Sequence, residues 1–401
     1  MKAIKVDQKE SGFHRIERLP PYVFTEINKI KDSARKNGHD IIDLGMGNPD
    51  SPTPKHIVDK LIETVKRPDT HGYSVSKGIL GLRQAICNYY ERRFNVKLDP
   101  ELEAIVTIGS KEGIANIANA ITTPGDSIIV SNPSYPIHPY GFIIVGGAIR
   151  YIPNDASRSD FVEQIKHEIK HCTPKPRAVV LNYPCNPTAE TVTLDFYEEI
   201  VDLCRHYNIY ILSDLAYCEI YFDDNPPPSV LQVKNAKDIA VEFTSCSKTY
   251  SMAGWRVGFA CGNQKLIHAL TRIKSYLDYG SFTPIQVAAA AALNGPQDCV
   301  DEVRALYQER RDILVSGLNN AGWPVTAPEA TMFIWAKIPD KFLHLGSLEF
   351  SKELLTKANV AVAPGIGFGQ YGDQHVRIAM VENKHRIRQA IKNIKNFMEK
   401  N

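Results

Sequence analysis

From about residue 100, the sequence alternates short apolar runs rich in β-branched residues with longer amphipathic runs, and this alternation limits the possible folds most strongly. A short apolar run bounded by turn residues is typical of a buried strand, and amphipathic runs between such strands predict helices that cross back over a sheet. In one connection, Leu194, Tyr197, Val201 and Cys204 recur at helical spacing. We therefore expect an α/β fold with a mostly parallel sheet between helices. The predicted strands are 103–109, 126–132, 177–183, 209–215, 240–246 and 256–262.

The pattern changes after about residue 300, which predicts a second unit of mixed helices and strands. A long charged helix is expected over about 299–322, a second helix near 347–355, and a last helix that begins near Asn383. A helix from about Tyr22 to Lys36 is expected to pack on this unit. The strands predicted for this unit are 331–338, 359–364 and 375–380.

The length of the chain, 401 residues, exceeds the usual size of a single hydrophobic core. We therefore predict two domains. The large α/β domain is expected over 49–299, and the smaller α+β domain is expected to form from 1–48 together with 300–401.

Composition and charge indicate a globular protein that acts on small molecules. The 47 basic and 45 acidic residues are spread along the chain, so we expect neither a nucleic-acid surface nor a membrane-binding face. We find no apolar stretch of signal-peptide length at the start and no run near the ~20 apolar residues of a membrane helix. The eight cysteines contain no CxxC pair, so we expect reduced thiols and no metal site. A cytoplasmic location is predicted.

Ligands of open parallel sheets bind beyond the carboxyl ends of the strands, so we inspected the residues that follow each predicted strand. Ser110 and Lys111 follow the run 103–109 and open a helix. The free N–H groups and the positive end of a helix suit an anion such as phosphate. A serine that only caps the helix is the alternative, and this segment alone does not decide between the two.

Three more strand ends carry side chains with two possible roles each. The ring of Tyr135 could stack on a planar ligand or only occupy a turn. Asn186 lies between prolines that restrict its backbone, so its amide could be held in one direction, or the segment could be a structural turn. Asp214 ends a strand, with Tyr217 three residues later. A buried carboxylate needs a partner, such as a protonated ring nitrogen of a cofactor, whereas a helix N-cap is the competing role.

Lys248 and two arginines complete the candidate site. Lys248 follows the run 240–246 beside Ser245, and Arg256 opens the next predicted strand. Most lysines are solvated, but desolvation at the inner end of a central strand would lower the pKa of the amine and favour the neutral nucleophile that condenses with an aldehyde. Arg377 lies mid-strand among apolar residues. Its guanidinium suits bidentate capture of a carboxylate, and an interdomain ion pair is the alternative.

The segments GSKEG, NPSYP, NPT, SDLAY, SCSK, GWRVGF and HVRIAM, in this order, resemble the class I and II aminotransferases of pyridoxal-phosphate fold type I. The resemblance covers nearly the whole chain and implies pyridoxal 5′-phosphate as the cofactor, bound to Lys248 as a Schiff base. It implies that Lys248 also moves a proton during catalysis and that Asp214 keeps the pyridine nitrogen protonated. The other implied cofactor contacts are Tyr217 and Asn186 at the phenolic oxygen, Tyr135 at the ring, and Ser110, Lys111, Ser245 and Arg256 at the phosphate.

The resemblance also implies substrate contacts and a second subunit. Arg377 would bind the α-carboxylate of the substrate, with Asn186 and Gly47 as further substrate-binding residues. Gly45 and Gly47 match the segment that closes over the substrate. Tyr73 resembles the tyrosine that reaches the phosphate of the neighbouring subunit, so a homodimer is expected.

One residue departs from the family's motifs. The family usually continues Asn-Pro-Thr with glycine, whereas Ala189 follows Thr188 here. We expect altered turn geometry at this position without loss of chemistry, because the side chain that acts is that of Asn186.

Within the family, segments such as RLPPYVF, RPDTHGYS and KSYLDYG are most similar to bacterial alanine aminotransferases of the glutamate–pyruvate type. We therefore expect amino-group exchange between alanine or glutamate and pyruvate or 2-oxoglutarate. Aspartate and LL-diaminopimelate aminotransferases are alternatives, although the second arginine of animal-type aspartate enzymes is missing between Arg272 and Arg304. A cofactor-dependent C–S lyase is a further alternative. A regulator on the same fold is not expected, because the resemblance starts near Arg15 and leaves no room for a DNA-binding domain.

Overall fold

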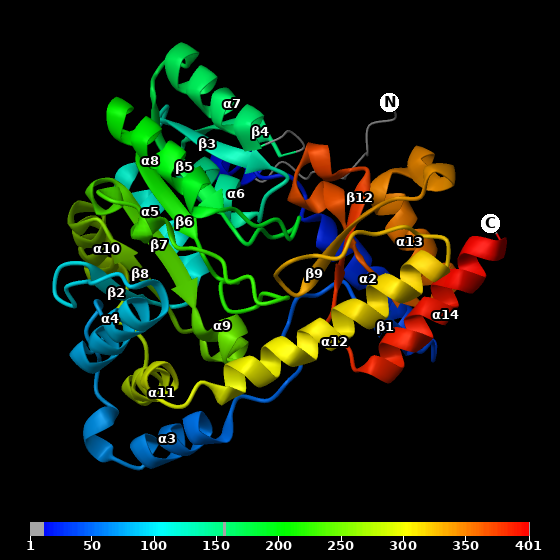
Figure 1. Ribbon diagram of the computed structural model, residues 1–401, viewed down its shortest axis with the longest axis horizontal. Helices are drawn as coiled ribbons and strands as arrows, with labels where there is room; N and C mark the ends of the chain where they lie inside the picture. Colours follow the sequence, from blue (N-terminus) through cyan, green and yellow to red (C-terminus); the bar gives the residue numbers. More distant parts are fainter. Residues whose placement is uncertain (1–11, 155–157, 401) are drawn as a thin grey trace.

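A seven-stranded sheet forms the centre of the larger part of the molecule in the computed structural model, which describes residues 12–154 and 158–400 (Figure 1). The strand order is β2-β8-β7-β6-β5-β3-β4, and all strands run parallel except β8, which is antiparallel to both neighbours. The predicted α/β fold is confirmed. The strands are β2 (Ala104–Thr107), β3 (Ser127–Asn132), β4 (Ala148–Pro153), β5 (Pro176–Asn182), β6 (Tyr210–Asp214), β7 (Ala240–Ser245) and β8 (Gly258–Gly262).

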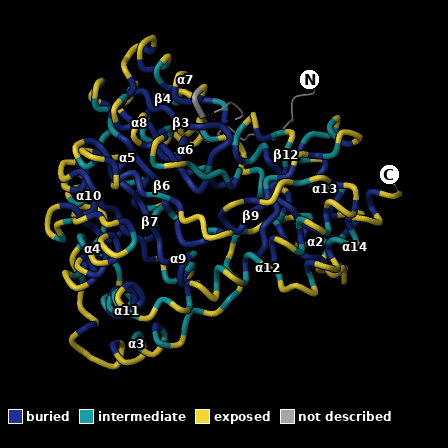
Figure 2. The backbone as a smooth tube through the Cα atoms, viewed as in Figure 1, coloured by how far each residue is buried: buried dark blue, intermediate teal, exposed yellow. Residues whose placement is uncertain are grey.

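Helices cover both faces of this sheet because successive strand residues point to opposite sides. Val179 packs into one hydrophobic layer, whereas Ala178 and Val180 pack into the other. The tube of Figure 2 shows the middle of the sheet as buried. The first layer contains α4 (Leu80–Phe94), α7 (Arg158–His171), α8 (Leu194–Tyr207) and α11 (Thr283–Asn294), with α3 (Lys55–Val65) against α11. The second layer contains α5 (Ser110–Ile121), α6 (Ile137–Ile144) and α10 (Gln264–Leu277).

The six strands predicted for this sheet are present, and a seventh, β4, was not predicted. β4 lies at the edge of the sheet, where Arg150 and Tyr151 are exposed and only Ile152 is buried. Its sequence therefore lacks the continuous apolar run by which the other strands were found. The predicted crossing helix is α8, in which Tyr197 and Cys204 are fully buried.

A second, smaller group of elements packs around its own core. Its helices match those expected after residue 300 and over Tyr22–Lys36, whereas the predicted strand 359–364 forms two short strands in different sheets and the strand over 42–43 was not predicted. The strands are β9 (Phe333–Lys337), β11 (Ala363–Pro364) and β12 (His375–Ala379) in one antiparallel sheet, and β1 (Ile42–Asp43) paired with β10 (Val360–Ala361). The helices are α2 (Val23–Lys36), α12 (Asp298–Asn320), α13 (Gly346–Ala358) and α14 (Lys384–Lys400).

The remaining elements are short. They are α1 (His14–Glu17), α9 (Cys246–Thr249) and the 3₁₀ turns η1 (Pro68–Thr70), η2 (Val230–Gln232), η3 (Ala236–Asp238), η4 (Ala253–Trp255), η5 (Asp340–Leu345), η6 (Gly365–Phe368) and η7 (Gln370–Gly372).

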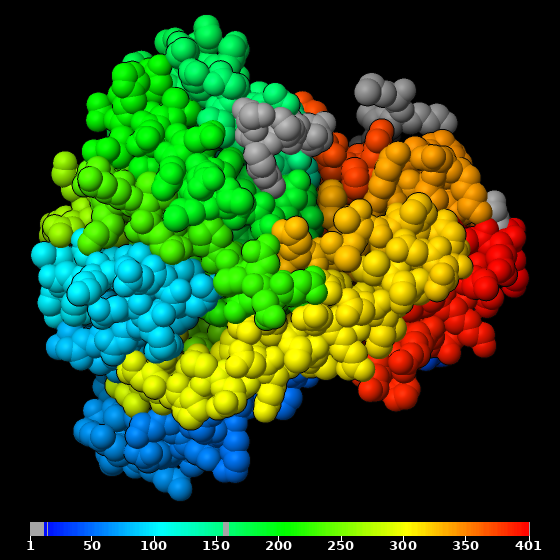
Figure 3. Space-filling view, in the orientation of Figure 1, coloured from blue at the N-terminus to red at the C-terminus, as the bar shows by residue number. Residues whose placement is uncertain are grey.

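The helix α12 joins the two groups of elements. In Figure 3 it lies across the molecule between the part that contains the large sheet and the part that contains α14. The second core also takes in Tyr217, Ile220 and Phe222 from the segment after β6. We propose that the chain forms two domains, one from residues 49–299 and the other from residues 1–48 together with 300–401. Residues 1–11 lie outside the described part of the chain.

Within residues 12–154 and 158–400, we find no helix with the length and apolar character needed to cross a membrane.

Candidate active site

A cavity of about 290 Å³ lies beyond the carboxyl ends of β5, β6 and β7, between the large sheet and the smaller group of elements. Strand order explains its position, because β5, β6 and β7 are neighbours and deliver the residues that follow them to one edge. Twelve residues singled out from the sequence line it: Gly45, Gly47, Ser110, Lys111, Tyr135, Asn186, Asp214, Tyr217, Ser245, Lys248, Arg256 and Arg377.

Lys248 projects into this cavity from the short helix α9, which Ser245 caps by accepting a hydrogen bond from the Ser247 N–H. The Lys248 Nζ donates to the carbonyl of Gly47 at 2.6 Å. Burial, reinforced by the positive charges of Arg377 and Arg256, lowers the pKa of the Lys248 amine to about 8. No carboxylate in the described part of the chain forms an ion pair with it. A solvated surface role is therefore wrong for Lys248, and its amine is suited to act as a nucleophile.

Asp214 is buried at the end of β6 and is bonded to a histidine that the sequence reasoning missed. The Nε2 atom of His138 lies 2.9 Å from Asp214 Oδ2, and Asp214 Oδ1 accepts from the Ala216 N–H at 3.2 Å. No helix begins directly after Asp214, so the N-cap alternative is wrong. Inspection of strand ends passed over His138 because it lies inside α6. The available signal was a histidine three residues after Tyr135 in an otherwise apolar helical segment.

Asn182, the last residue of β5, was also missed. Its side-chain amide donates to the Asp214 carbonyl at 2.9 Å, and its Oδ1 accepts from the Asn186 N–H at 2.9 Å. Asn182 is directly opposite Asp214 in the β5–β6 register. The strand register thus fixes Asn186 beside Asp214, which no sequence pattern reveals.

The start of α5 and the guanidinium of Arg256 form one corner of the cavity. Gly109, not Ser110, is the N-cap of α5, and Ser110 is its first residue and makes no capping bond, so the capping alternative is wrong. A Cβ atom on Gly109 would lie 2.4 Å from Arg256 Nη2, so only glycine lets the arginine approach the helix end this closely. The Arg256 backbone has a φ of 58°, a conformation that costs energy for a non-glycine residue and clusters at functional sites.

This corner carries uncompensated positive charge. Among the described residues, no carboxylate pairs with Lys111 or Arg256, and Arg256 donates only to the carbonyls of Ala253 and Ile108. The Lys111 Nζ lies 5.9 Å from the centre of the Tyr135 ring. Two cations at a helix N-terminus form a site for an anion with several oxygens.

Arg377, on β12, is only 7% exposed and is bonded to neutral groups. Its Nη1 donates to Asn186 Oδ1 at 2.7 Å and its Nη2 to the Gly45 carbonyl at 3.1 Å, whereas its Nε has no partner among the described residues. The guanidinium carbon lies 4.1 Å from the Phe333 ring centre and 4.6 Å from that of Phe368. Since no described carboxylate pairs with Arg377, the interdomain ion pair is wrong.

Comparison with known proteins identifies the family. The family model described as "Aminotransferase class I and II" matches residues 39–394. This chain is a class I and II aminotransferase. It is similar to the putative aminotransferase AatC of Rhizobium meliloti, with 61% identity over 96% of this chain and 95% of the relative. It is also similar to the glutamate-pyruvate aminotransferase AlaC of Escherichia coli, with 54% identity over 96% and 93%.

Two further similarities cover almost the whole aminotransferase. The LL-diaminopimelate aminotransferase of Moorella thermoacetica is 42% identical over 96% of this chain and 98% of the relative. The substrate-bound structure of BacF from Bacillus subtilis superimposes with a TM-score of 0.88 at 33% identity, covering 96% of this chain and 97% of that one. The predicted family and the predicted class of enzyme, a transferase of amino groups, are therefore confirmed.

The aminotransferase depends on pyridoxal 5′-phosphate, as its family does, and the cavity fits this cofactor. Lys111, Lys248, Arg256 and Arg377 line it with no carboxylate bonded to any of them among the described residues, while Asp214 is bonded to His138. Such a cavity favours an anionic ligand that also carries a group reactive toward an amine. A phosphate and an aldehyde on one ring meet both conditions.

Ala189 accepts the conformation that glycine favours. Its φ is 63°, its N–H donates to the Cys185 carbonyl at 2.9 Å, and the Cys185 N–H donates to the Glu190 carbonyl at 2.9 Å. The turn that contains Asn186 is thus closed by two backbone hydrogen bonds, with Ala189 in a left-handed conformation.

Tyr73 is the predicted site residue that lies away from the cavity. It is 89% exposed, and its ring centre lies 4.8 Å from that of Tyr279. Its predicted role concerns a neighbouring subunit, so it stays a prediction.

In residues 12–154 and 158–400, no group of three or more His, Cys, Asp or Glu side chains is arranged to hold a metal ion.

Proposed function

We propose that this aminotransferase moves an amino group between alanine or glutamate and pyruvate or 2-oxoglutarate. The observation that carries the proposal is the state of Arg377, a buried cation in the cavity that Lys248 enters, which among the described residues is bonded only to neutral atoms. A buried charge needs a partner, and the α-carboxylate shared by all four compounds supplies one.

We propose that the residues found around the cavity hold the cofactor as the family resemblance implies. Ser110, Lys111, Ser245 and Arg256 hold its phosphate, Tyr135 lies against its ring, Tyr217 and Asn186 bond its phenolic oxygen, Asp214 bonds its ring nitrogen, and Lys248 holds its aldehyde. When bound, the cofactor withdraws electrons from the α-carbon of the amino acid. The bond to His138 orients Asp214 before any ligand arrives. Arg256 is oriented in the same way, because it donates to the carbonyls of Ala253 and Ile108.

The chain's own side chains carry out the binding and proton steps. Arg377 binds the α-carboxylate and thereby fixes the α-carbon relative to Lys248. With the cofactor bound, the Lys248 Nζ would accept the proton that leaves the α-carbon and pass it to the cofactor, and in the second half of the reaction it would move a proton in the opposite direction. A pKa of about 8 suits this exchange, because near neutral pH both the charged and the neutral amine are populated. Asp214, oriented by His138, stabilises positive charge at the ring nitrogen.

Similarity supports the choice of alanine and glutamate over the alternatives. The relative AlaC, named a glutamate-pyruvate aminotransferase, is 54% identical, whereas the Moorella relative named an LL-diaminopimelate aminotransferase is 42% identical, each over 96% of this chain. Since both similarities are high, LL-diaminopimelate is the second candidate donor.

A matrix of amino donors and 2-oxo acceptors tests the substrate assignment. Purified holoenzyme is incubated with alanine, glutamate, aspartate or LL-diaminopimelate and with pyruvate, 2-oxoglutarate or oxaloacetate, and products are quantified. We expect the highest kcat/KM for alanine with 2-oxoglutarate. Preference for LL-diaminopimelate or aspartate would overturn the substrate assignment but not the transamination, whereas release of pyruvate and ammonia from cystathionine would indicate a C–S lyase.

We also propose a homodimer in which Tyr73 reaches the neighbouring active site. Exposed aromatic and aliphatic side chains gather on the segments around Tyr73 and Tyr279, and such patches mark interfaces. They are Tyr73, Val75, Tyr276, Leu277, Tyr279 and Phe282, with exposed fractions between 43% and 89%.

A further inference from the structure

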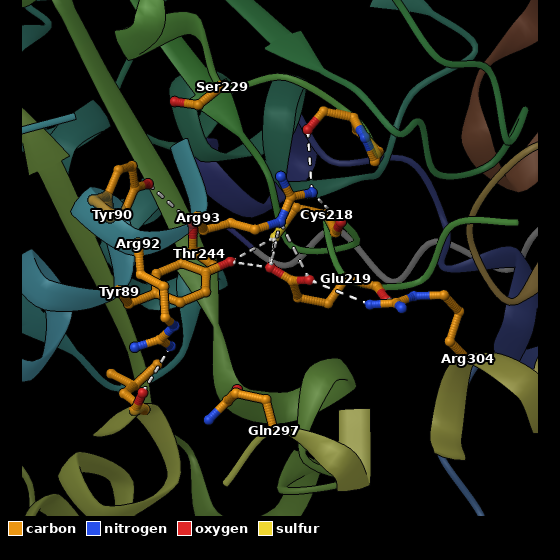
Figure 4. Close-up of polar contacts among 12 residues, drawn as sticks. Tyr89, Tyr90, Arg92, Arg93, Cys218, Glu219, Ser229, Thr244, Gln297 and Arg304 are labelled. Atoms are coloured by element: carbon orange, nitrogen blue, oxygen red, sulfur yellow. Dashed lines mark hydrogen bonds and ion pairs between the residues drawn. The ribbon is translucent and has the colours of Figure 1, made fainter. Parts of the chain in front are cut away.

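Glu219 is a buried carboxylate outside the cavity, two residues after Tyr217. Its Oε1 accepts from the Tyr89 hydroxyl at 2.5 Å and from the Arg93 Nε at 3.2 Å, and its Oε2 lies 3.8 Å from the Arg304 Nη2 (Figure 4). Glu219 is 6% exposed and does not line the cavity. One carboxylate is therefore held by two guanidinium groups and one phenol.

The two arginines come from different parts of the fold. Arg93 lies in α4, which packs on the large sheet, and Arg304 lies in α12, which extends to the smaller group of elements. Both also bind the backbone of the same segment, because Arg93 Nη2 donates to the Cys218 carbonyl at 3.4 Å and Arg304 Nε to the Glu219 carbonyl at 3.4 Å. Side-chain and main-chain contacts thus hold residues 218–219 from both sides.

This segment connects directly to Tyr217. The Ile220 N–H donates to the Tyr217 carbonyl at 3.0 Å, and the Thr331 N–H donates to the Ile220 carbonyl at 2.8 Å. The Tyr217 ring packs edge-on against Phe333, with 5.5 Å between ring centres. A shift of Glu219 would therefore move the phenol of Tyr217, whose segment is held on its other side by Asp214 through the bond to His138.

Stability alone is a weak reason for such a cluster. A buried ion pair often contributes no more than apolar groups of the same shape, while it fixes geometry more narrowly. We propose that Glu219, held between Arg93 and Arg304, is a positioning residue that fixes the phenol of Tyr217 in the cavity. The proposal rests on the proposed function in one respect, the assignment of Tyr217 to the phenolic oxygen of the cofactor.

The test uses the visible absorbance of the cofactor in resting, full-length holoenzyme, titrated with pH in the absence of substrate. A hydrogen bond from Tyr217 to the cofactor oxygen should lower the apparent pKa of the absorbance change. We expect Glu219→Gln to raise this apparent pKa by about half a unit or more and to lower kcat about tenfold, with KM for alanine changed less than about threefold. Glu302→Gln, an exposed glutamate on the same helix as Arg304, is the matched control and should match wild type.

A double-mutant cycle with Tyr217→Phe decides whether Glu219 acts through Tyr217. If it does, Glu219→Gln adds no further shift in the Tyr217→Phe background. Full additivity of the two shifts would overturn the proposal, as would a Glu219→Gln variant that unfolds at lower urea concentration but keeps the wild-type titration. If Glu219→Gln does not fold, Arg304→Gln serves instead, with a smaller shift in the same direction expected and an unchanged titration contradicting the proposal.

Failure of the proposed function gives a different result. If Tyr217 does not contact the cofactor, Tyr217→Phe itself leaves the titration unchanged. A wrong amino donor leaves the absorbance titration unaffected, because that measurement contains no substrate.

Discussion

Arg377 is the residue whose surroundings point most directly to a substrate group. Its guanidinium is buried between Phe333 and Phe368, and within the described part of the chain it is bonded only to Asn186 and to the Gly45 carbonyl. Burial lowers the pKa of Arg377 to about 10, so the group remains charged at neutral pH. The protein therefore maintains a desolvated positive charge that an incoming carboxylate can neutralise.

Replacement of Arg377 by alanine should weaken the binding of every substrate that carries an α-carboxylate. We expect kcat/KM to fall roughly a hundredfold for both alanine and glutamate, because the transition state loses about 3 kcal/mol of stabilisation. Steady-state kinetics with both donors measures the effect. The exposed Arg388, replaced by alanine, is the control. Unchanged kinetics in Arg377→Ala would reassign it to a structural role.

Ala189 gives a residue-scale test of backbone conformation. At a φ of 63°, glycine is unstrained, alanine is strained and a β-branched residue is strained more. Ala189→Gly should leave the free energy of unfolding unchanged or raise it by up to about 1 kcal/mol, since strain relief and chain entropy oppose each other. Ala189→Val should lower it by about 2 kcal/mol. Urea unfolding of both variants measures the difference, and a valine variant as stable as wild type would contradict the left-handed turn.

Some features of the site could be predicted from single residues in the sequence, and others could not. The place of Lys248 in the cavity could be predicted, because a lysine among buried runs is unusual and its motif is specific. The Asp214–His138 bond could not, because residues 76 positions apart meet only through the packing of α6 on the sheet. The alternatives left open for Ser110, Asp214 and Arg377 needed coordinates for the same reason.

At the scale of elements, β7 contains a fully buried glutamate in its centre. Glu242 accepts hydrogen bonds from the hydroxyls of Tyr90 and Ser213 at 3.0 Å each and from the Val230 N–H at 3.2 Å. Burial raises the pKa of Glu242 to about 7, although these hydrogen bonds act in the opposite direction. Between about pH 4.5 and pH 7, the folded protein thus retains a proton that the unfolded chain releases.

This proton makes stability depend on pH. The stabilisation from Glu242 protonation is complete below pH 4.5, the ordinary value, and is lost as pH rises through about 7. The loss amounts to about 3 kcal/mol. Urea unfolding of wild type and Glu242→Gln should therefore diverge between pH 5 and pH 8, with the glutamine variant gaining relative stability. A constant difference across this range would contradict the raised pKa.

The elements that sequence predicts well are those whose side chains are buried on both faces or on one stripe. All six apolar runs became strands of the large sheet, and the connection with Tyr197 and Cys204 became α8. The edge strand β4 was not predicted, because it is defined by its hydrogen bonds to β3 and not by a pattern of buried side chains. The antiparallel direction of β8 likewise follows from pairing that periodicity does not record.

At the scale of the whole molecule, both groups of elements contribute to one site. Lys248 and Asp214 come from strand ends of the large sheet, whereas Arg377 comes from β12 and Gly47 follows β1. The active site therefore depends on how the two groups pack. The helix α12 and the Glu219 cluster connect them directly.

The homodimer proposal belongs to the same scale. Light scattering should give twice the mass of the chain. Tyr73→Phe should weaken pyridoxal 5′-phosphate binding about tenfold, because one hydrogen bond to a charged group is lost. The mass should not change in this variant. Tyr371→Phe, at an exposed tyrosine outside the proposed interface, is the control. A monomeric, fully active enzyme would contradict the proposal.

We propose that Lys248 is the amine that holds the cofactor. Reduction of the holoenzyme with borohydride makes a carbon–nitrogen bond to the cofactor permanent, and peptide mass spectrometry then locates it. We predict one modified lysine per chain, Lys248, and no modification in a Lys248→Ala variant. Attachment at any other lysine, or none at all, would contradict the account.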